Sequence, residues 1–156
     1  MKETGVCPLK KHIFMKIVPI LKGWSNDKKY CVTSKEGIKY LLRISPNDQF
    51  DRKEKEFEIM RQVYALKIPM CQPIDFGICE DGVYSLQSWI DGKDAEKVIP
   101  NLSISKQYAY GYKAGEILKN IHTIPAPEKQ EDWEIYFNAK IDRKIQMYTN
   151  CPIKYE

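Results

Sequence analysis

The sequence has few of the residues from which metal sites and disulfide frameworks are built. Its 156 residues include two histidines and five cysteines, which is an odd number. The cysteines are widely spaced and no two of them form the Cys-x-x-Cys pair that is typical of zinc sites. We therefore expect neither a zinc centre nor a set of disulfides to organise the fold.

Long hydrophobic runs are also missing. The longest apolar stretch, Ile13–Leu21, is interrupted by Lys16 and Pro19, and it is far shorter than the ~20 residues of a membrane-spanning helix. Residues 1–11 are basic but lack the apolar segment and the cleavage site of an export signal. The sequence predicts no membrane span and no membrane partner, and we expect a cytoplasmic location.

Neither sign of charge dominates the chain. There are 25 Lys and Arg residues against 21 Asp and Glu residues, a net charge of +4, and no basic block exceeds three residues. This charge is too weak for a nucleic-acid footprint. A single-strand nucleic-acid binder using Tyr30, Tyr40 and Tyr84 remains an alternative that would need clustered lysines on the same sheet face. The 43% hydrophobic content suffices for a packed core and excludes global disorder.

The first half of the chain alternates β-type segments with turn residues. The pattern predicts five antiparallel strands: Val18–Gly23, Lys28–Ser34, Lys39–Ile44, Pro73–Glu80 and Gly82–Trp89. The last two are joined by Glu80-Asp81-Gly82, which is a hairpin signal. We therefore expect one antiparallel sheet.

Helical periodicity is predicted in three segments. The first is Glu54–Leu66, after a capping-box spacing that begins at Asp51; the second is a long helix that Ser103 or Ser105 caps. The third runs from Asp132 to about Thr149, and one stripe of this helix is apolar. The stripe consists of Trp133, Phe137, Ile141, Ile145 and Tyr148. We expect it to be partly exposed and the chain to self-associate through it.

The predicted order is therefore three strands, a helix, two strands and then helices only. The fold class is α+β, and this order is typical of the nucleotide-binding small lobe of a kinase, followed by the first helices of a helical lobe. We expect the small lobe to cover residues 1–90, and the hinge with the start of the helical lobe to cover residues 91–156.

Two charged residues stand out against this layout. Arg43 is the only charged residue within Tyr40–Ile44, and Glu56 has apolar residues at positions i+3, i+4 and i+7. A carboxylate on an apolar helix face needs a cationic partner, and Arg43 is the nearest cation in the layout. We predict a partly buried ion pair between Arg43 and Glu56; the alternative is a surface arginine.

The loop between the first two strands is a candidate for binding phosphate. Its residues 23–28 include Gly23 and Ser25, so that backbone N–H groups and the Ser25 hydroxyl can face phosphate oxygens. The alternative is an ordinary hairpin turn.

Taken in order and spacing, five segments resemble the aminoglycoside phosphotransferase family. They are Gly23–Tyr30, Tyr40–Ile44, the helix that contains Glu56, Ile68–Ile74 and Leu86–Gly92. Members of that family share the protein-kinase-like fold and phosphorylate small hydroxylated molecules from ATP. The resemblance implies the same fold for this chain, with ATP as its cofactor and a nucleotide and a small hydroxylated molecule as its ligands.

The resemblance also implies a set of nucleotide-binding residues. The loop over the phosphates would hold Gly23, Ser25, Asn26, Asp27 and Lys28. Arg43 would be the strand cation and Glu56 its helix partner. The hinge that hydrogen-bonds adenine through its backbone would consist of Gln87, Ser88, Trp89 and Ile90.

The family's catalytic residues have no counterpart in this sequence. The family has a His-Gly-Asp-x-x-x-x-Asn loop followed by an aspartate for magnesium, whereas His122 precedes Thr123-Ile124-Pro125 and no His-x-Asp occurs. Asp75-Phe76-Gly77 spells a kinase metal motif but lies before the hinge, so we interpret it as coincidence. We expect an amino-terminal segment without catalytic residues or metal ligands, with Mg²⁺ required only by full-length relatives. The alternative is a non-catalytic nucleotide-binding or interaction module.

Overall fold

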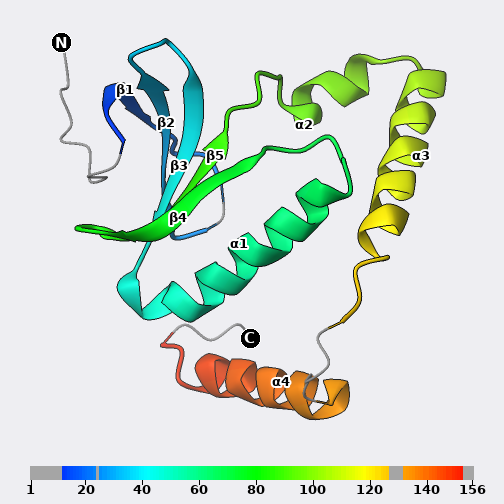
Figure 1. Ribbon diagram of the computed structural model, residues 1–156. Coiled ribbons are helices and arrows are strands. Elements are labelled where there is room, and N and C mark those ends of the chain that lie inside the picture. The colour runs from blue at the N-terminus through cyan, green and yellow to red at the C-terminus, as the bar shows by residue number, and fades with distance from the viewer. Residues whose placement is uncertain (1–11, 24, 127–131, 153–156) are drawn as a thin grey trace. The chain divides into compact units, whose positions relative to one another are not determined.

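The computed structural model describes residues 12–23, 25–126 and 132–152 of the chain (Figure 1). These residues divide into two compact units, residues 1–124 and residues 125–156. The first unit contains the sheet and three helices, and the second contains a single long helix.

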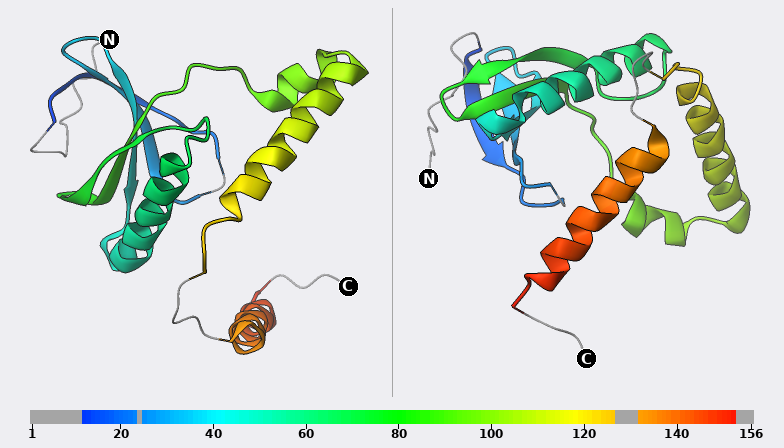
Figure 2. Two further views of the ribbon diagram at one scale, coloured as in Figure 1. Left: turned by 45° about the vertical axis from the view of Figure 1, so that its right-hand side comes forward. Right: turned by 90° about the horizontal axis from the view of Figure 1, so that it is seen from below.

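A five-stranded antiparallel sheet forms the main part of the first unit, with the strands in the order β1-β2-β3-β5-β4. The strands are β1 (Phe14–Pro19), β2 (Lys28–Ser34), β3 (Lys39–Ser45), β4 (Pro73–Cys79) and β5 (Gly82–Ser88). Helix α1 (Phe50–Ala65) connects β3 to β4 and packs against β4 and β5, beside the sheet in both views of Figure 2. The predicted α+β class and the layout of a kinase small lobe are confirmed.

Strand alternation divides the sheet into two different faces. Leu42 and Ile44 on β3 point to one face and are almost fully buried, together with Val32, Tyr84 and Leu86 from the neighbouring strands. On the opposite face, the intervening residues Arg43 and Ser45 of β3 and Val83, Ser85 and Gln87 of β5 line a cavity beside α1. The larger apolar cluster therefore lies on one face of the sheet, whereas the α1 face combines polar residues with the buried Phe57 and Val83.

Aromatic rings attach α1 to the sheet. Phe57 is the buried residue of this helix, and its ring lies 5.3 Å from the ring of Phe76 on β4. Phe50, in the first turn, lies 5.6 Å from the same ring. These contacts fix the helix over β4 and thereby position its first two turns beside β3.

The two largest errors in the predicted boundaries concern β1 and α1. Strand β1 runs from Phe14 to Pro19, not from Val18 to Gly23, because its pairing with β2 begins at Phe14 and already reaches Tyr30 at Pro19. Beyond Pro19, the bond from Ile20 N to Lys29 O at 2.8 Å continues the pairing by one step. Helix α1 begins at Phe50, because a 3-10 turn over residues 47–49 leads directly into it. The capping box at Asp51 is wrong, since Asp51 lies inside the first turn.

Three further helices come after the sheet: α2 (Ala95–Val98), α3 (Ile104–Ile121) and α4 (Trp133–Thr149). Helix α4 begins one residue after Asp132, close to the predicted start, and the carboxylate of Asp132 caps it by accepting the N–H groups of Glu134 and Ile135. Ser103 occupies the cap position of α3 without a side-chain hydrogen bond to the helix backbone.

None of the described side chains of α3 and α4 is buried. The apolar stripe of α4 is exposed as predicted, from 41% for Ile141 to 64% for Trp133. Across the described residues, no helix combines the length and the apolar character needed to cross a membrane.

Candidate functional site

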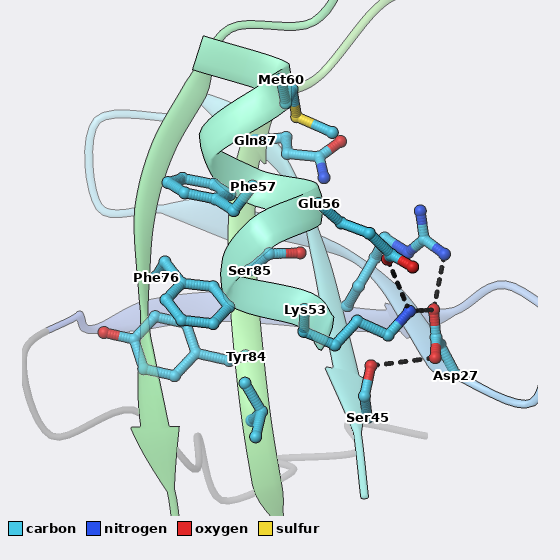
Figure 3. A pocket seen from close by; sticks show the side chains of 12 residues that line it. Asp27, Ser45, Lys53, Glu56, Phe57, Met60, Phe76, Tyr84, Ser85 and Gln87 are labelled. Atoms are coloured by element: carbon cyan, nitrogen blue, oxygen red, sulfur yellow. Dashed lines mark hydrogen bonds and ion pairs between the residues drawn. The ribbon is translucent and has the colours of Figure 1, made fainter. Parts of the chain in front are cut away.

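A cluster of charged side chains forms where the β1–β2 loop, β3 and α1 meet (Figure 3). At its centre is the carboxylate of Asp27, whose side chain is only 5% exposed. One oxygen, Oδ2, accepts from Arg43 Nη2 at 2.5 Å and from Lys53 Nζ at 3.2 Å. The other, Oδ1, accepts from Ser45 Oγ at 2.9 Å. The buried carboxylate is thus compensated by two cations and a hydroxyl, as its burial requires.

Lys53 extends this cluster along α1. Its Nζ also lies 3.1 Å from Oε2 of Glu56, one helical turn further on. The second oxygen of Glu56 accepts from Nε of Arg52 at 2.8 Å. The charges therefore alternate without a break from Arg43 through Asp27, Lys53 and Glu56 to Arg52.

The predicted ion pair between Arg43 and Glu56 is wrong. Both residues line the same cavity, but Arg43 pairs with Asp27 and Glu56 pairs with Lys53 and Arg52. Glu56 lies at the edge of the helix with its side chain 45% exposed, because the face that packs on the sheet is the one that carries Phe57. The cation that Glu56 needs comes from its own helix.

Sequence reasoning missed Lys53 and Ser45. Lys53 stands three residues before Glu56, a spacing that brings side chains together on a helix. That spacing was available in the sequence and could have identified the lysine. By contrast, Lys53 and Ser45 contact Asp27 only because of where the loop places Asp27. That position cannot be predicted from a local sequence pattern.

Both carboxyls of the cluster are held in their charged form. Burial raises the pKa of Asp27, but hydrogen bonds from Ser45, Arg43 and Lys53 outweigh it and leave the pKa below its ordinary value. Burial also raises the pKa of Glu56, and the neighbouring Lys53 and Arg52 lower it further than burial raises it. Three cations and two carboxylates thus face one another, which leaves a formal surplus of one positive charge.

The loop that carries Asp27 is shaped by a glycine. Gly23 has φ +125°, and a Cβ at this position would lie 2.5 Å from Nζ of Lys29. That ammonium donates to the carbonyl of Lys22 at 3.0 Å and so closes the loop. Of the other loop residues predicted to bind phosphate, Ser25, Asn26 and Lys28 are exposed and lie outside the cluster. Trp24 lies outside the described residues.

The predicted hinge starts inside the sheet. Gln87 is 3% exposed, and its side-chain oxygen accepts from Sγ of Cys71 at 3.2 Å. The N–H of Ser88 donates to the carbonyl of Gln72 at 2.9 Å. These two positions belong to β5 and bind the neighbouring segment before β4.

After Ser88, the backbone N–H groups of the predicted hinge are less firmly bound to the sheet. The N–H of Trp89 still points to β3, 3.4 Å from the carbonyl of Lys39, and its indole donates to Asp91 at 3.0 Å. The N–H of Ile90 has no hydrogen-bond partner within the described part of the chain. Of the four predicted hinge residues, Ile90 is therefore the one whose N–H is available to a ligand.

The cavity enclosed by the charged cluster is small. Its volume of about 30 Å³ is enough for a water molecule but not for a nucleotide. A phosphate group would therefore have to meet the cluster from its solvent side, where the Arg43 side chain is 32% exposed.

Asp75, the first residue of the apparent kinase metal motif, lies within β4 and has other partners. Its Oδ2 accepts from the hydroxyl of Tyr84 at 2.9 Å and lies 2.7 Å from Nε2 of His12. Throughout the described ranges, no three His, Cys, Asp or Glu side chains gather so that they could hold a metal ion. The described residues therefore do not fit a magnesium site.

Comparison with known proteins identifies the family. No curated protein and no solved structure matches this chain. The sequence profile APH, described as the phosphotransferase enzyme family, matches residues 16–154. This range includes the whole sheet apart from the first two residues of β1, together with the charged cluster, the hinge and the helices after it. The chain therefore belongs to the phosphotransferase enzyme family.

Proposed function

We propose that the chain binds ATP and forms the amino-terminal, nucleotide-binding part of a kinase that phosphorylates a hydroxyl group of a small molecule. The observation that carries this proposal is the pair of cations, Arg43 and Lys53, which converge on a single oxygen beside the β1–β2 loop. Catalysis of phosphoryl transfer consists mainly of positioning the phosphates and stabilising their charge. Two fixed cations on a kinase-like sheet and helix are suited to that task.

The proposal assigns the nucleotide to residues 1–90 and the start of a helical lobe to residues 91–156. Arg43 and Lys53 bind the phosphate groups, while the exposed loop residues Ser25, Asn26 and Lys28 cover them. The free N–H of Ile90 binds the edge of the adenine ring. Ser25, Asn26, Lys28 and Ile90 are exposed and the Arg43 side chain is 32% exposed, whereas the Lys53 side chain is 14% exposed.

We propose further that these 156 residues by themselves do not transfer the phosphoryl group. The sequence contains no His-x-Asp segment, so the family's catalytic base has no candidate within it. Mg²⁺ and its ligands belong to full-length relatives in this proposal. The acceptor is aminoglycoside-like, meaning a small molecule with several hydroxyl groups, because that is the substrate class of the family that the chain resembles.

A non-catalytic nucleotide-binding or interaction module is the second candidate, and the missing catalytic motif favours it. The two candidates share the nucleotide site and differ in whether a catalytic half accompanies that site. A companion chain or a downstream reading frame that carries the His-Gly-Asp motif supports the kinase. Its absence from the source genome supports the module.

Calorimetric titration of the chain with ATP tests the shared part of the proposal. We expect weak binding, and we expect Arg43→Gln to weaken it at least ten-fold because a phosphate-binding cation is lost. Arg143→Gln, which removes the same charge from the exposed helix α4, is the matched control and should bind as the unchanged chain does.

Two results would refute the proposal. One is the absence of ATP binding at millimolar concentration; the other is equal weakening by both arginine variants, which would mean that only overall charge matters. Incubation with labelled ATP and an aminoglycoside tests the proposal that the 156 residues alone do not transfer the phosphoryl group. We expect no labelled product from the chain alone.

A further inference from the structure

We propose that Asp27 is a built-in competitor of the nucleotide: its carboxylate occupies the position on Arg43 and Lys53 that phosphate oxygens take, and binding of a polyphosphate displaces it. This inference deepens the proposed function and rests on it. It concerns regulation of the same site, since the strength of the contact made by Asp27 sets how readily the site accepts an anion.

The geometry of the contact supports this proposal. Arg43 and Lys53 belong to different elements, yet both donate to the same oxygen of Asp27, at 2.5 and 3.2 Å. One anionic oxygen shared by two cations is also how a phosphate oxygen binds between an arginine and a lysine. The carboxylate of Asp27 therefore stands where a bound phosphate would make its best contacts.

The net charge of the cluster also supports competition between Asp27 and a polyphosphate. With Asp27 in place, Arg43, Lys53 and Arg52 face two carboxylates, and the formal surplus is one positive charge. Without Asp27 the surplus is two. An approaching polyphosphate would also meet the carboxylate at close range, in a site of low exposure where repulsion is weakly screened.

Displacement of Asp27 requires little rearrangement of the core. Asp27 directly precedes β2, and residues 21–23 and 25–26 before it are exposed, with Leu21 94% exposed. Its three partners are bound through its side chain. A change of side-chain rotamer together with movement of this exposed loop would release both cations while the strands keep their register.

The test is a calorimetric titration with ATP and, separately, with inorganic tripolyphosphate, at low salt. Asp27→Asn keeps the size of the side chain and an acceptor for Ser45 but removes the charge. We expect this variant to bind both ligands about ten-fold more tightly than the unchanged chain. Asp81→Asn, at the exposed β4–β5 turn, removes the same charge elsewhere and should leave both affinities unchanged.

Ser45→Ala provides a second variant in case Asp27→Asn fails to fold. It removes the donor to Oδ1 and loosens Asp27 without touching either cation. We expect it to bind tripolyphosphate two- to three-fold more tightly. Adding salt should shrink the gain in both variants, because the competition is electrostatic.

The outcomes separate this inference from the proposed function. Equal or weaker binding by both variants, with ATP still bound by the unchanged chain, overturns the competition and leaves the nucleotide site standing. Tighter tripolyphosphate binding by Asp27→Asn without any ATP binding supports the competition for anions and refutes the nucleotide function. If no ligand binds to any variant, both proposals are wrong.

Discussion

The sheet with α1 and the two long helices differ sharply in how they bury their apolar side chains. All eight buried hydrophobic residues among the described ones lie between Val32 and Leu86, in the sheet, in α1 and in the segment after α1. Helices α3 and α4 also carry many large apolar side chains, but none of those described is buried. The sheet with its helix thus contains its own core, whereas a lone amphipathic helix depends on another element to cover its stripe.

Of two matched leucine substitutions, the one in the sheet should strongly lower the free energy of unfolding, and the one on α3 should hardly change it. Leu42 is 1% exposed in the core of the sheet, and Leu118 is 52% exposed on α3. Leu42→Ala should lower the free energy of unfolding by about 3 kcal/mol, because it leaves a cavity. Leu118→Ala should change it by less than about 1 kcal/mol, since alanine favours a helix and no core contact is lost.

Urea denaturation monitored by circular dichroism measures both values. Similar losses for the two variants would mean that α3 is as tightly packed as the sheet, and would contradict the comparison.

Alkaline pH should destabilise the sheet through Tyr84. Burial, with a hydrogen bond to Asp75, raises the pKa of Tyr84 to about 12. The neutral phenol is therefore favoured in the folded state. Its stabilising effect is complete below pH 10 and is lost as the pH rises through 12, by up to about 3 kcal/mol.

Unfolding measured at pH 9 and at pH 11.5 tests this prediction, with two phenylalanine variants for comparison. Tyr84→Phe should remove most of the pH dependence in this range. Tyr108→Phe, at a position on α3 that is 74% exposed, should retain it. A steep loss of stability that persists in Tyr84→Phe would assign the effect to another group.

The apolar stripe of α4 should cause the chain to self-associate. Its side chains are 41–64% exposed, and full burial of such a side chain contributes about 1.5–3 kcal/mol. We expect the weight-average mass in sedimentation experiments to rise with concentration, and Ile145→Lys to reduce this rise. Gln146→Lys adds the same charge beside the stripe and should have little effect.

A monomer over a wide range of concentrations, together with no binding of an apolar dye, would contradict the prediction. It would show that the stripe is covered within a single chain in solution.

The smallest expected effect concerns the caps of the two long helices. Asp132 accepts two backbone N–H groups of α4, whereas Ser103 makes no such bond to α3. Asp132→Ala should therefore destabilise the start of α4 by about 1 kcal/mol, and Ser103→Ala should destabilise α3 by less. Hydrogen exchange of the amides of Glu134 and Ile135 reports the first effect. Unchanged hydrogen exchange in both variants would mean that the caps do not limit fraying of the helix ends.

The elements could be predicted better than the contacts between them. Strand Lys28–Ser34 was predicted residue for residue, because alternation and turn residues are local signals. The start of α1 was missed, since the 3-10 turn over residues 47–49 has no pattern of its own. In the candidate site, Asp27, Arg43 and Glu56 were all named from the sequence, but the ion pair predicted between Arg43 and Glu56 was wrong.

The sequence by itself determined the class of fold and the order of the strands and long helices, because both depend on periodicity along the chain. It also pointed to the family, through the resemblance of its segments in order and spacing. Only the tertiary structure decided which charges meet. Asp27 reaches Arg43 and Lys53 across 16 and 26 positions, respectively. The bend of the loop at Gly23 and the packing of Phe57 on Phe76 bring them together. A carboxylate takes whichever cations folding places within hydrogen-bond distance, and that distance is set by packing in space, not by position in the sequence.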